Sequence, residues 1–319
     1  MPFPRLSLTL VRIVSTSNES APLVETAAGS HLTAGQGHAI SPAASTVIDP
    51  NNPPWGLVAA FLVWLSSVLL LFGVALAFII PYAALKAPGM DRESLAQFLA
   101  TDKTAILLTV ISAIPAHLIT LGIIWAVVTR FGKRPFWRTL GWSRGKGFGF
   151  WTSAGLAALL YVIAISLIYA FGLEDTDTAL ARLVSSSRAT AIAIAVMAVV
   201  TAPLVEEMVY RGVLYSALQK AAGRTWAIVG VLLLFTLIHV PQYWPNYGAI
   251  AAVGLLSVSL TLVRAYTGRL LPCFIMHLVF NGIQSALILF EPYLRQLFTK
   301  SEQNAAFIHN LPEAIRNLF

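Results

Sequence analysis

The chain has 319 residues, of which 57% are hydrophobic and only 11% are charged, and its formal net charge is +7. Soluble domains carry roughly 25% charged residues, so this composition excludes an ordinary soluble protein and indicates a membrane protein. The positive charge does not indicate nucleic-acid binding, because six of the basic residues lie in one loop, 130–149, between apolar stretches, and the single cysteine, Cys273, excludes an intramolecular disulfide framework.

The first 56 residues differ from the rest of the chain. They are rich in Ser, Thr, Ala, Gly and Asn, and they show no sustained hydrophobic period. Such a segment buries too little apolar surface to offset the entropy lost on ordering. We therefore predict that residues 1–56 form a disordered N-terminal extension.

Stretches without charged residues indicate the membrane-spanning helices, each of which needs about 20 apolar residues. They are 50–85, 104–129, 147–173, 189–205, 225–263 and 270–290. The longest one contains prolines and polar residues at 241–248, which indicate a turn between two helices. The predicted fold is therefore an all-α, polytopic membrane bundle of about seven transmembrane helices.

The predicted segments follow one another closely along the chain. The spans are 57–80, closed by Pro81, then 104–129, 150–172, 189–217, 225–240, 249–265 and 270–290. A short amphipathic helix at the membrane surface is predicted within 86–103. The chain thus divides into the N-terminal extension, a membrane domain over 57–290, and an amphipathic C-terminal tail over 291–319.

Basic residues are distributed unevenly between the two sides of the predicted bundle. The side that holds the N-terminus has twelve Lys and Arg residues, and the other side has eight. Because cytoplasmic loops carry the excess of Lys and Arg, we predict a cytoplasmic N-terminus and an outside C-terminus. The low cysteine count and compact loops are typical of a bacterial protein, which places it in the inner membrane.

Two adjacent glutamates, Glu206 and Glu207, interrupt the apolar fourth span. A carboxylate at mid-helix costs roughly 2.5–3.5 kcal/mol on insertion scales, so such residues are rare and usually functional. The apolar segments that follow contain His239, His277 and Asn281. These polar residues indicate an intramembrane catalytic site.

The predicted helix boundaries place these residues at similar depths. At 1.5 Å per residue, Glu206 lies roughly 18 Å from the cytoplasmic end of its helix and His239 roughly 21 Å. His277 and Asn281 lie roughly 10–17 Å from the same surface. The sequence therefore predicts that all four residues share one site.

Spacing within each helix separates the expected roles. Glu207 and Arg211 are four residues apart, so they share a helix face and form a structural ion pair. Glu206 points away from them and stays available for chemistry. His277 and Asn281 are also four apart, so their side chains point toward one spot.

Three motifs on separate apolar helices carry a resemblance to a known family. The residues are Glu-Glu-Met-Val-Tyr-Arg at 206–211, Phe-Thr-Leu-Ile-His at 235–239 and His-Leu-Val-Phe-Asn at 277–281. In this order they resemble the CAAX proteases and bacteriocin-processing enzymes, the CPBP or Abi family. The resemblance covers about 190–285 and implies that 57–290 is a membrane protease domain with its motif-bearing core at 189–285.

The resemblance implies an intramembrane endopeptidase that cleaves membrane-associated or lipidated peptides, and family members are described both as metalloproteases and as metal-free glutamate enzymes. Water activation by Glu206 with His239, and an oxyanion site made by His277 and Asn281, are the preferred mechanism. Glu206, His239 and His277 could instead bind zinc, so the cofactor is either none or zinc.

Two other functions are compatible with the same residues. The first is a non-proteolytic immunity or scaffold protein that keeps the fold. The second is a proton-coupled transporter that uses Glu206 as its proton carrier, although the sequence has no visible internal repeat of the kind common in transporters. The expected partners are the lipid bilayer and a peptide or lipidated-protein substrate, without nucleic acid.

Overall fold

The computed structural model describes residues 48–171 and 177–299, with side chains as far as 293, and this part of the chain is built from helices without strands. The helices are α1 (Leu57–Lys86), α2 (Arg92–Thr101), α3 (Lys103–Ile111), α4 (Ala113–Thr129), α5 (Phe136–Thr139), α6 (Phe150–Ala170), α7 (Ala179–Ser186), α8 (Arg188–Glu206), the π-helix η1 (Glu207–Leu214), α9 (Tyr215–Tyr243), α10 (Tyr247–Thr267) and α11 (Leu271–Thr299). The predicted all-α bundle is confirmed.

Six helical stretches among the described residues are long and apolar enough to cross a membrane. One of them, Arg188–Tyr243, has 56 residues and contains Gly223 with a φ of 84°, a conformation that favours glycine. Beyond this point the chain folds back and brings Gly230 against Leu218. A Cβ on Gly230 would lie 3.2 Å from the side chain of Leu218. The predicted fourth and fifth spans are the two arms of this hairpin, and the protein is an integral membrane protein.

Two prolines lie inside helices that the sequence predicted to end there. α1 continues through Pro81 to Lys86, and α9 continues through Pro241 to Tyr243. A proline removes one helical hydrogen bond, and membrane helices tolerate this loss when neighbouring groups satisfy the freed carbonyl. Both predicted boundaries were therefore too early.

The second and the last of the predicted spans also differ from the prediction. The second span is divided at Ser112 into α3 and α4. α11 continues beyond 290 through Pro292 to Thr299, so the first part of the predicted tail is helical. Residues 300–319 lie outside the described part of the chain.

α2 confirms a short helix between the first two spans. The carboxylate of Asp91 caps its start, and the carboxylate of Asp102 caps the start of α3. The N–H of Ala105 and the hydroxyl of Tyr82 donate to Asp102 and hold the pKa of that carboxyl group below its usual value. The contact from Tyr82 ties α1 to the junction of α2 and α3.

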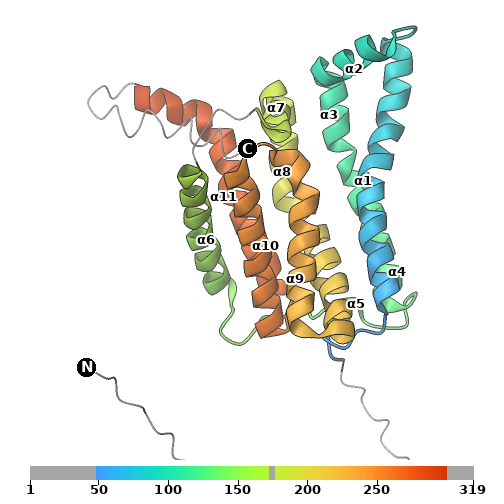
Figure 1. Ribbon diagram of the computed structural model, residues 1–319, viewed down its shortest axis with the longest axis vertical. Helices are drawn as coiled ribbons and strands as arrows, with labels where there is room; N and C mark the ends of the chain where they lie inside the picture. The colour runs from blue at the N-terminus through green and yellow to red at the C-terminus, as the bar shows by residue number, and fades with distance from the viewer. Residues whose placement is uncertain (1–47, 172–176, 300–319) are drawn as a thin grey trace, which may run out of the picture. The chain divides into compact units, whose positions relative to one another are not determined.

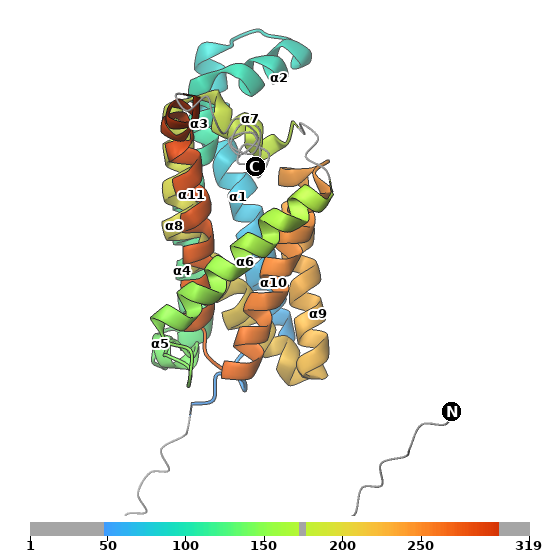
Figure 2. The same ribbon diagram turned by 90° about the vertical axis from the view of Figure 1, so that its left-hand side faces the viewer.

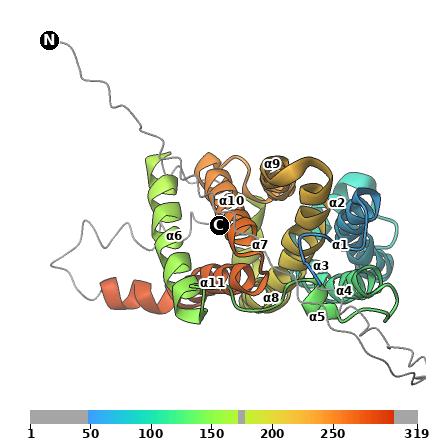
Figure 3. The same ribbon diagram turned by 90° about the horizontal axis from the view of Figure 1, so that it is seen from below.

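The long helices pack in pairs that bring the polar motifs together. α10 packs on α9 and α6, α11 packs on α8 and α6, and α1 packs on α4 and η1. Figure 1 shows these helices side by side, and Figure 2 shows α6 crossing α10 and α11 obliquely. Seen along the helices in Figure 3, α8, α9 and α10 lie between α6 on one side and α1 with α4 on the other, and the end of α11 projects beyond α6.

Small residues allow close contact between these helices. Ala60, Ala116, Ala157 and Ala227 are fully buried, as expected in a bilayer, where helices associate by close packing rather than by the hydrophobic effect. The tightest approach is at Gly248 in α10, where a Cβ would lie 2.8 Å from the Cα of Ile168. A larger residue at this position would separate α10 from α6.

Residues 48–56 differ from the prediction of disorder over 1–56, because they pack against the helices. The indole of Trp55 is buried and donates to the carbonyl of Val213 at 3.0 Å. Basic side chains donate to carbonyls of this proline-rich segment, which offers acceptors without competing N–H donors. These contacts are Arg264 to Asn51 Oδ1 (2.8 Å) and Pro50 O (3.2 Å), Lys220 to Pro53 O (3.0 Å) and Arg130 to Pro54 O (2.6 Å). The prediction for 1–47 lies outside the described residues.

Two N-terminal truncations distinguish the role of residues 48–56 from that of the residues before them. Removing 1–46 is expected to leave the melting temperature unchanged, whereas removing 1–56 deprives the buried guanidinium of Arg264 of two acceptors. Hydrogen bonds to charged groups contribute about 1.5–3 kcal/mol each, so the shorter protein should melt several degrees lower. Thermal unfolding in one detergent measures both effects, with Asn51→Ala as an intermediate case. Equal melting temperatures would contradict a structural role for 48–56.

Candidate active site

The adjacent glutamates lie where the α-helix α8 becomes the π-helix η1. α8 ends at Glu206 and η1 begins at Glu207, and the N–H of Tyr215 donates to the carbonyl of Tyr210, five residues earlier. The sequence predicted an uninterrupted span over 189–217 and did not predict the π-helix. All eight residues of η1 are buried.

Side chains donate to three consecutive carbonyls of η1. The pairs are Arg264 Nε to Arg211 O (3.1 Å), Ser216 Oγ to Gly212 O (2.7 Å) and Trp55 Nε1 to Val213 O (3.0 Å). These donors stabilise a backbone that departs from α-helical hydrogen bonding. Two of them lie 53 and 158 residues away along the chain, so the local sequence pattern could not reveal the π-helix.

Glu207 and Arg211 form the ion pair that their four-residue spacing predicts. Arg211 Nη1 lies 3.0 Å from Glu207 Oε1, and both side chains are fully buried. The guanidinium also donates to the side chain of Thr261 and to the carbonyl and hydroxyl of Ser257, all on α10. Its carbon lies 4.5 Å from the ring centroid of Phe235. Arg211 therefore joins η1, α9 and α10.

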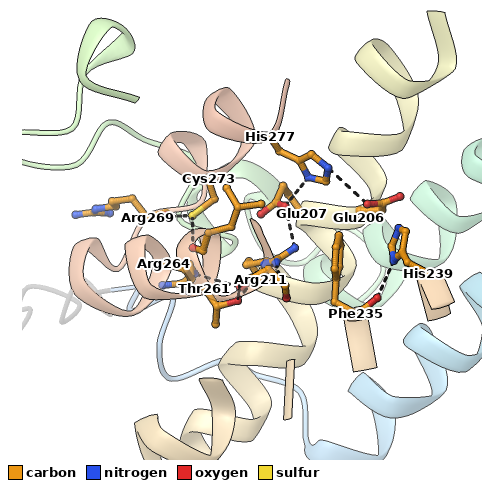
Figure 4. Close-up of polar contacts among 12 residues, drawn as sticks. Glu206, Glu207, Arg211, Phe235, His239, Thr261, Arg264, Arg269, Cys273 and His277 are labelled. Carbon is orange, nitrogen blue, oxygen red and sulfur yellow. Dashed lines mark hydrogen bonds and ion pairs between the residues drawn. The ribbon is translucent and has the colours of Figure 1, made fainter. Parts of the chain in front are cut away.

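His277 lies between the two glutamates (Figure 4). Its Nδ1 donates to Glu207 Oε1 at 2.8 Å, and its Nε2 lies 3.8 Å from Glu206 Oε2. The second distance is longer than a hydrogen bond. Glu207 thus orients His277 in addition to neutralising Arg211, a role that the sequence did not reveal because the two residues lie on different helices.

His239 is held by its own helix. Its Nδ1 lies 2.7 Å from the carbonyl of Phe235, four residues earlier, and its ring stacks on the ring of Phe235 at 4.5 Å. A carbonyl can only accept, so Nδ1 carries the proton and Nε2 of the neutral ring has a free lone pair. The Phe-x-x-x-His spacing therefore fixes both the position and the tautomer of this histidine.

The four residues predicted to share a site line one cavity of about 560 Å³. They are Glu206, His239, His277 and Asn281. The side chain of Glu206 is 25% exposed, whereas that of its neighbour Glu207 is completely buried. The depths estimated from the helix boundaries therefore place these residues together, and only one of the two carboxylates is open to the cavity.

Asn281 differs in one respect from the prediction. Its Nδ2 donates to the carbonyl of Ala198 on α8 at 2.9 Å, so one of its two N–H groups ties α11 to α8. The second N–H is left for the cavity. His277 and Asn281 line the same cavity, but the amide is not directed entirely toward the reaction site.

His117 and Arg264 are two further buried polar residues near the site. His117 Nδ1 lies 2.9 Å from the hydroxyl of Thr201, which ties α4 to α8. Arg264, near the end of the predicted span 249–265, is completely buried. Its partners are carbonyls and an amide that come from distant segments, so the sequence contained no signal for its position.

The positions of Glu206, His239 and His277 decide whether the site fits a zinc ion. Within 48–171 and 177–293, no three His, Cys, Asp or Glu side chains are grouped closely enough to hold a metal ion. Glu206 and His277 approach each other, but His239 does not complete a group of three. We therefore derive no catalytic step through a metal.

A comparison with protein-family models found a match that covers the three motifs. Residues 188–283 match the family described as type II CAAX prenyl endopeptidase, Rce1-like. The matched segment contains all three motifs, which confirms the resemblance to CAAX proteases. Neither a curated protein nor a solved structure matches the chain.

Proposed function

From the match of residues 188–283 to the type II CAAX prenyl endopeptidases, we propose that the protein hydrolyses a peptide bond of a membrane-associated or lipidated substrate inside the bilayer. The observation that carries this proposal is the asymmetry between the two glutamates. Glu207 is buried and paired with Arg211 and His277, whereas Glu206 faces a cavity that His239 also lines. One carboxylate is structural, and the other is free to exchange a proton with water.

In the proposed mechanism Glu206 is the general base. It takes a proton from a water molecule that also donates to the free Nε2 of His239, and the resulting hydroxide adds to the carbonyl carbon of the substrate. The carboxyl group of Glu206 then gives this proton to the leaving amine. The C–N bond breaks, the substrate carbonyl becomes a carboxylic acid, and Glu206 returns to its ionised form.

His277 and Asn281 are proposed to stabilise the negative oxygen of the tetrahedral intermediate. In its doubly protonated form His277 donates to Glu207 through Nδ1 and to the oxyanion through Nε2. The second N–H of Asn281 is the other donor. This arrangement uses the amide group that remains after Asn281 has bonded to the carbonyl of Ala198.

Asn281→Ala tests the oxyanion proposal. Loss of one such donor is expected to lower kcat by about 10²–10³-fold with little change in KM, because the interaction strengthens only as charge develops. Ser285→Ala is the matched comparison, since the hydroxyl of Ser285 also ties α11 to α8, through the carbonyl of Ala195 at 3.5 Å. Similar small losses of kcat in both variants would show that Asn281 only ties the helices together.

The direct test is cleavage of a fluorogenic lipidated peptide by the purified protein, with and without a metal chelator. Cleavage that persists with chelator supports the glutamate mechanism, and cleavage that zinc restores after chelation supports the metal-dependent alternative. A folded protein that cleaves neither lipidated nor unmodified peptides would favour the immunity or scaffold function, or a transporter in which Glu206 carries protons. The cytoplasmic N-terminus and the bacterial inner membrane remain predictions, which cysteine labelling in intact cells can test.

A further inference from the structure

A second, smaller cavity reaches the site from the side of α1 and α4. Its volume is about 80 Å³, and it lies between α1, α4, α8, η1 and α9. The larger cavity also touches α1 and α4, but it extends further, to α6, α10 and α11. Both cavities are lined by Glu206 and His239, so they meet at the groups proposed to activate water.

Seven of the twelve residues that line the small cavity are polar and can bind water, and the other five are aliphatic. The polar ones are Ser67, His117, Thr120, Glu206, Tyr210, His239 and Gln242. This is unusual for a space enclosed by membrane-spanning helices, where polar residues are expensive. It contrasts with the larger cavity, whose lining is mainly aliphatic and aromatic.

The hydrogen bonds already formed by these groups leave both donors and acceptors available. Tyr210 accepts a hydrogen bond from Trp64 Nε1 at 3.1 Å, so its own O–H group can donate. The hydroxyls of Ser67 and Thr120 donate to carbonyls of their own helices, so their lone pairs can accept. Together with Nε2 of His239, these groups provide the two to four polar partners that a buried water molecule requires.

The volume of the small cavity is suited to a few water molecules. A water molecule takes about 30 Å³ of liquid volume, so the cavity has room for about two or three of them. We propose that this cavity stores the water that is consumed in hydrolysis, and that Ser67, Thr120 and Tyr210 position it beside Glu206 and His239. The inference rests on the proposed function, because hydrolysis consumes water at this depth.

The arrangement separates water from the substrate until the two meet at Glu206. The substrate occupies the larger, apolar cavity, and the water enters from the polar side between α1 and α4. A bound lipid or peptide in the larger cavity therefore does not have to exchange places with the incoming water. In this arrangement Ser67, Thr120 and Tyr210 are positioning residues, since they act on the substrate only through water.

A volume series at Ser67 tests the proposal. kcat is expected to fall in the order Ala, Val, Leu, because each added methyl group takes space from the water, and Ser67→Leu should lose about tenfold or more. KM is expected to stay within about twofold of its original value, since the substrate occupies the other cavity. Ser166→Leu on α6 is the matched control, because this serine is exposed and lines neither cavity.

Tyr210→Phe keeps the result interpretable if the larger residues at Ser67 reduce folding. This change removes the hydroxyl, and with it the hydrogen bond from Trp64 Nε1, so the melting temperature should fall slightly while kcat falls by about tenfold at unchanged KM. If Tyr210→Phe, and every folded Ser67 variant, keep kcat within twofold, the water cavity is overturned. A folded original protein that cleaves no lipidated peptide would instead overturn the proposed function itself, so the two failures are distinguishable.

Discussion

Replacing Glu206 with glutamine is expected to lower kcat by about 10²–10⁴-fold, the usual contribution of a positioned general base. Glutamine keeps the size of the side chain but cannot accept a proton from water. The side chain is partly exposed to the cavity and has no ion partner within hydrogen-bond distance in the described structure, so the folded protein should lose little stability. His239→Ala should lower kcat in the same way, because it removes the Nε2 lone pair beside the water.

The measurement compares cleavage of the fluorogenic lipidated peptide with the melting temperature of each variant. Glu93→Gln on α2 is the matched control, since this glutamate is exposed and lies outside both cavities. Glu206→Gln should bind an uncleaved peptide as well as the original protein does. Turnover by Glu206→Gln within about threefold of the original rate would remove Glu206 from the mechanism.

Breaking the Glu207–Arg211 pair is expected to have the largest effect on stability. Removing one partner of a buried ion pair leaves the other charge without compensation, which costs about 3–5 kcal/mol. Arg211→Ala leaves Glu207 with His277 alone, and Glu207 Oε2 has no hydrogen-bond partner among the described residues even in the intact protein. Glu207→Ala leaves the Arg211 cation with only neutral partners.

Denaturant or thermal unfolding of the two single variants and the double variant provides the measurement. The double alanine variant is expected to lose less stability than the sum of the single losses, because it leaves neither charge unpaired. Arg211→Lys keeps the charge but not the planar group that reaches Thr261 and Ser257, so only partial recovery is expected. Additive losses would contradict the energetic coupling of the pair.

Glu207→Ala should also affect catalysis beyond its effect on stability. It removes the acceptor that orients Nδ1 of His277, whereas Arg211→Ala leaves this hydrogen bond in place. Among the molecules that remain folded, kcat should therefore be lower for Glu207→Ala than for Arg211→Ala. Equal kcat values, corrected for the folded fraction, would contradict the positioning role of Glu207.

The helical fold could be predicted because it depends on local properties of the chain. An apolar stretch of sufficient length is enough to indicate a membrane-spanning helix, whatever its neighbours are. Two of the errors occurred at Pro81 and Pro241, where local reasoning placed a helix end. A helix can continue through a proline when the surrounding bundle supports it, and the sequence around a proline does not describe that bundle.

The residues of the predicted site could also be identified largely from local features of the sequence. The spacing of Glu207 and Arg211 placed two charges on one helix face, and the depth of each motif placed the carboxylate and histidines at one level of the bilayer. Sequence reasoning therefore predicted that Glu206, His239, His277 and Asn281 would lie near one another, and all four line the larger cavity. It did not predict how their hydrogen bonds would be divided, as the contact between Asn281 and the carbonyl of Ala198 shows.

The sequence by itself determined the class of protein, the approximate position of its spans and the four motif residues that line one cavity, because hydrophobicity and helical spacing act over a few turns. Only the tertiary structure decided that His277 lies between the two glutamates, that η1 is a π-helix, and that Arg264 binds residues 50–51. These features depend on donors and acceptors that are far apart in the chain, and their pairing is settled only when the helices pack.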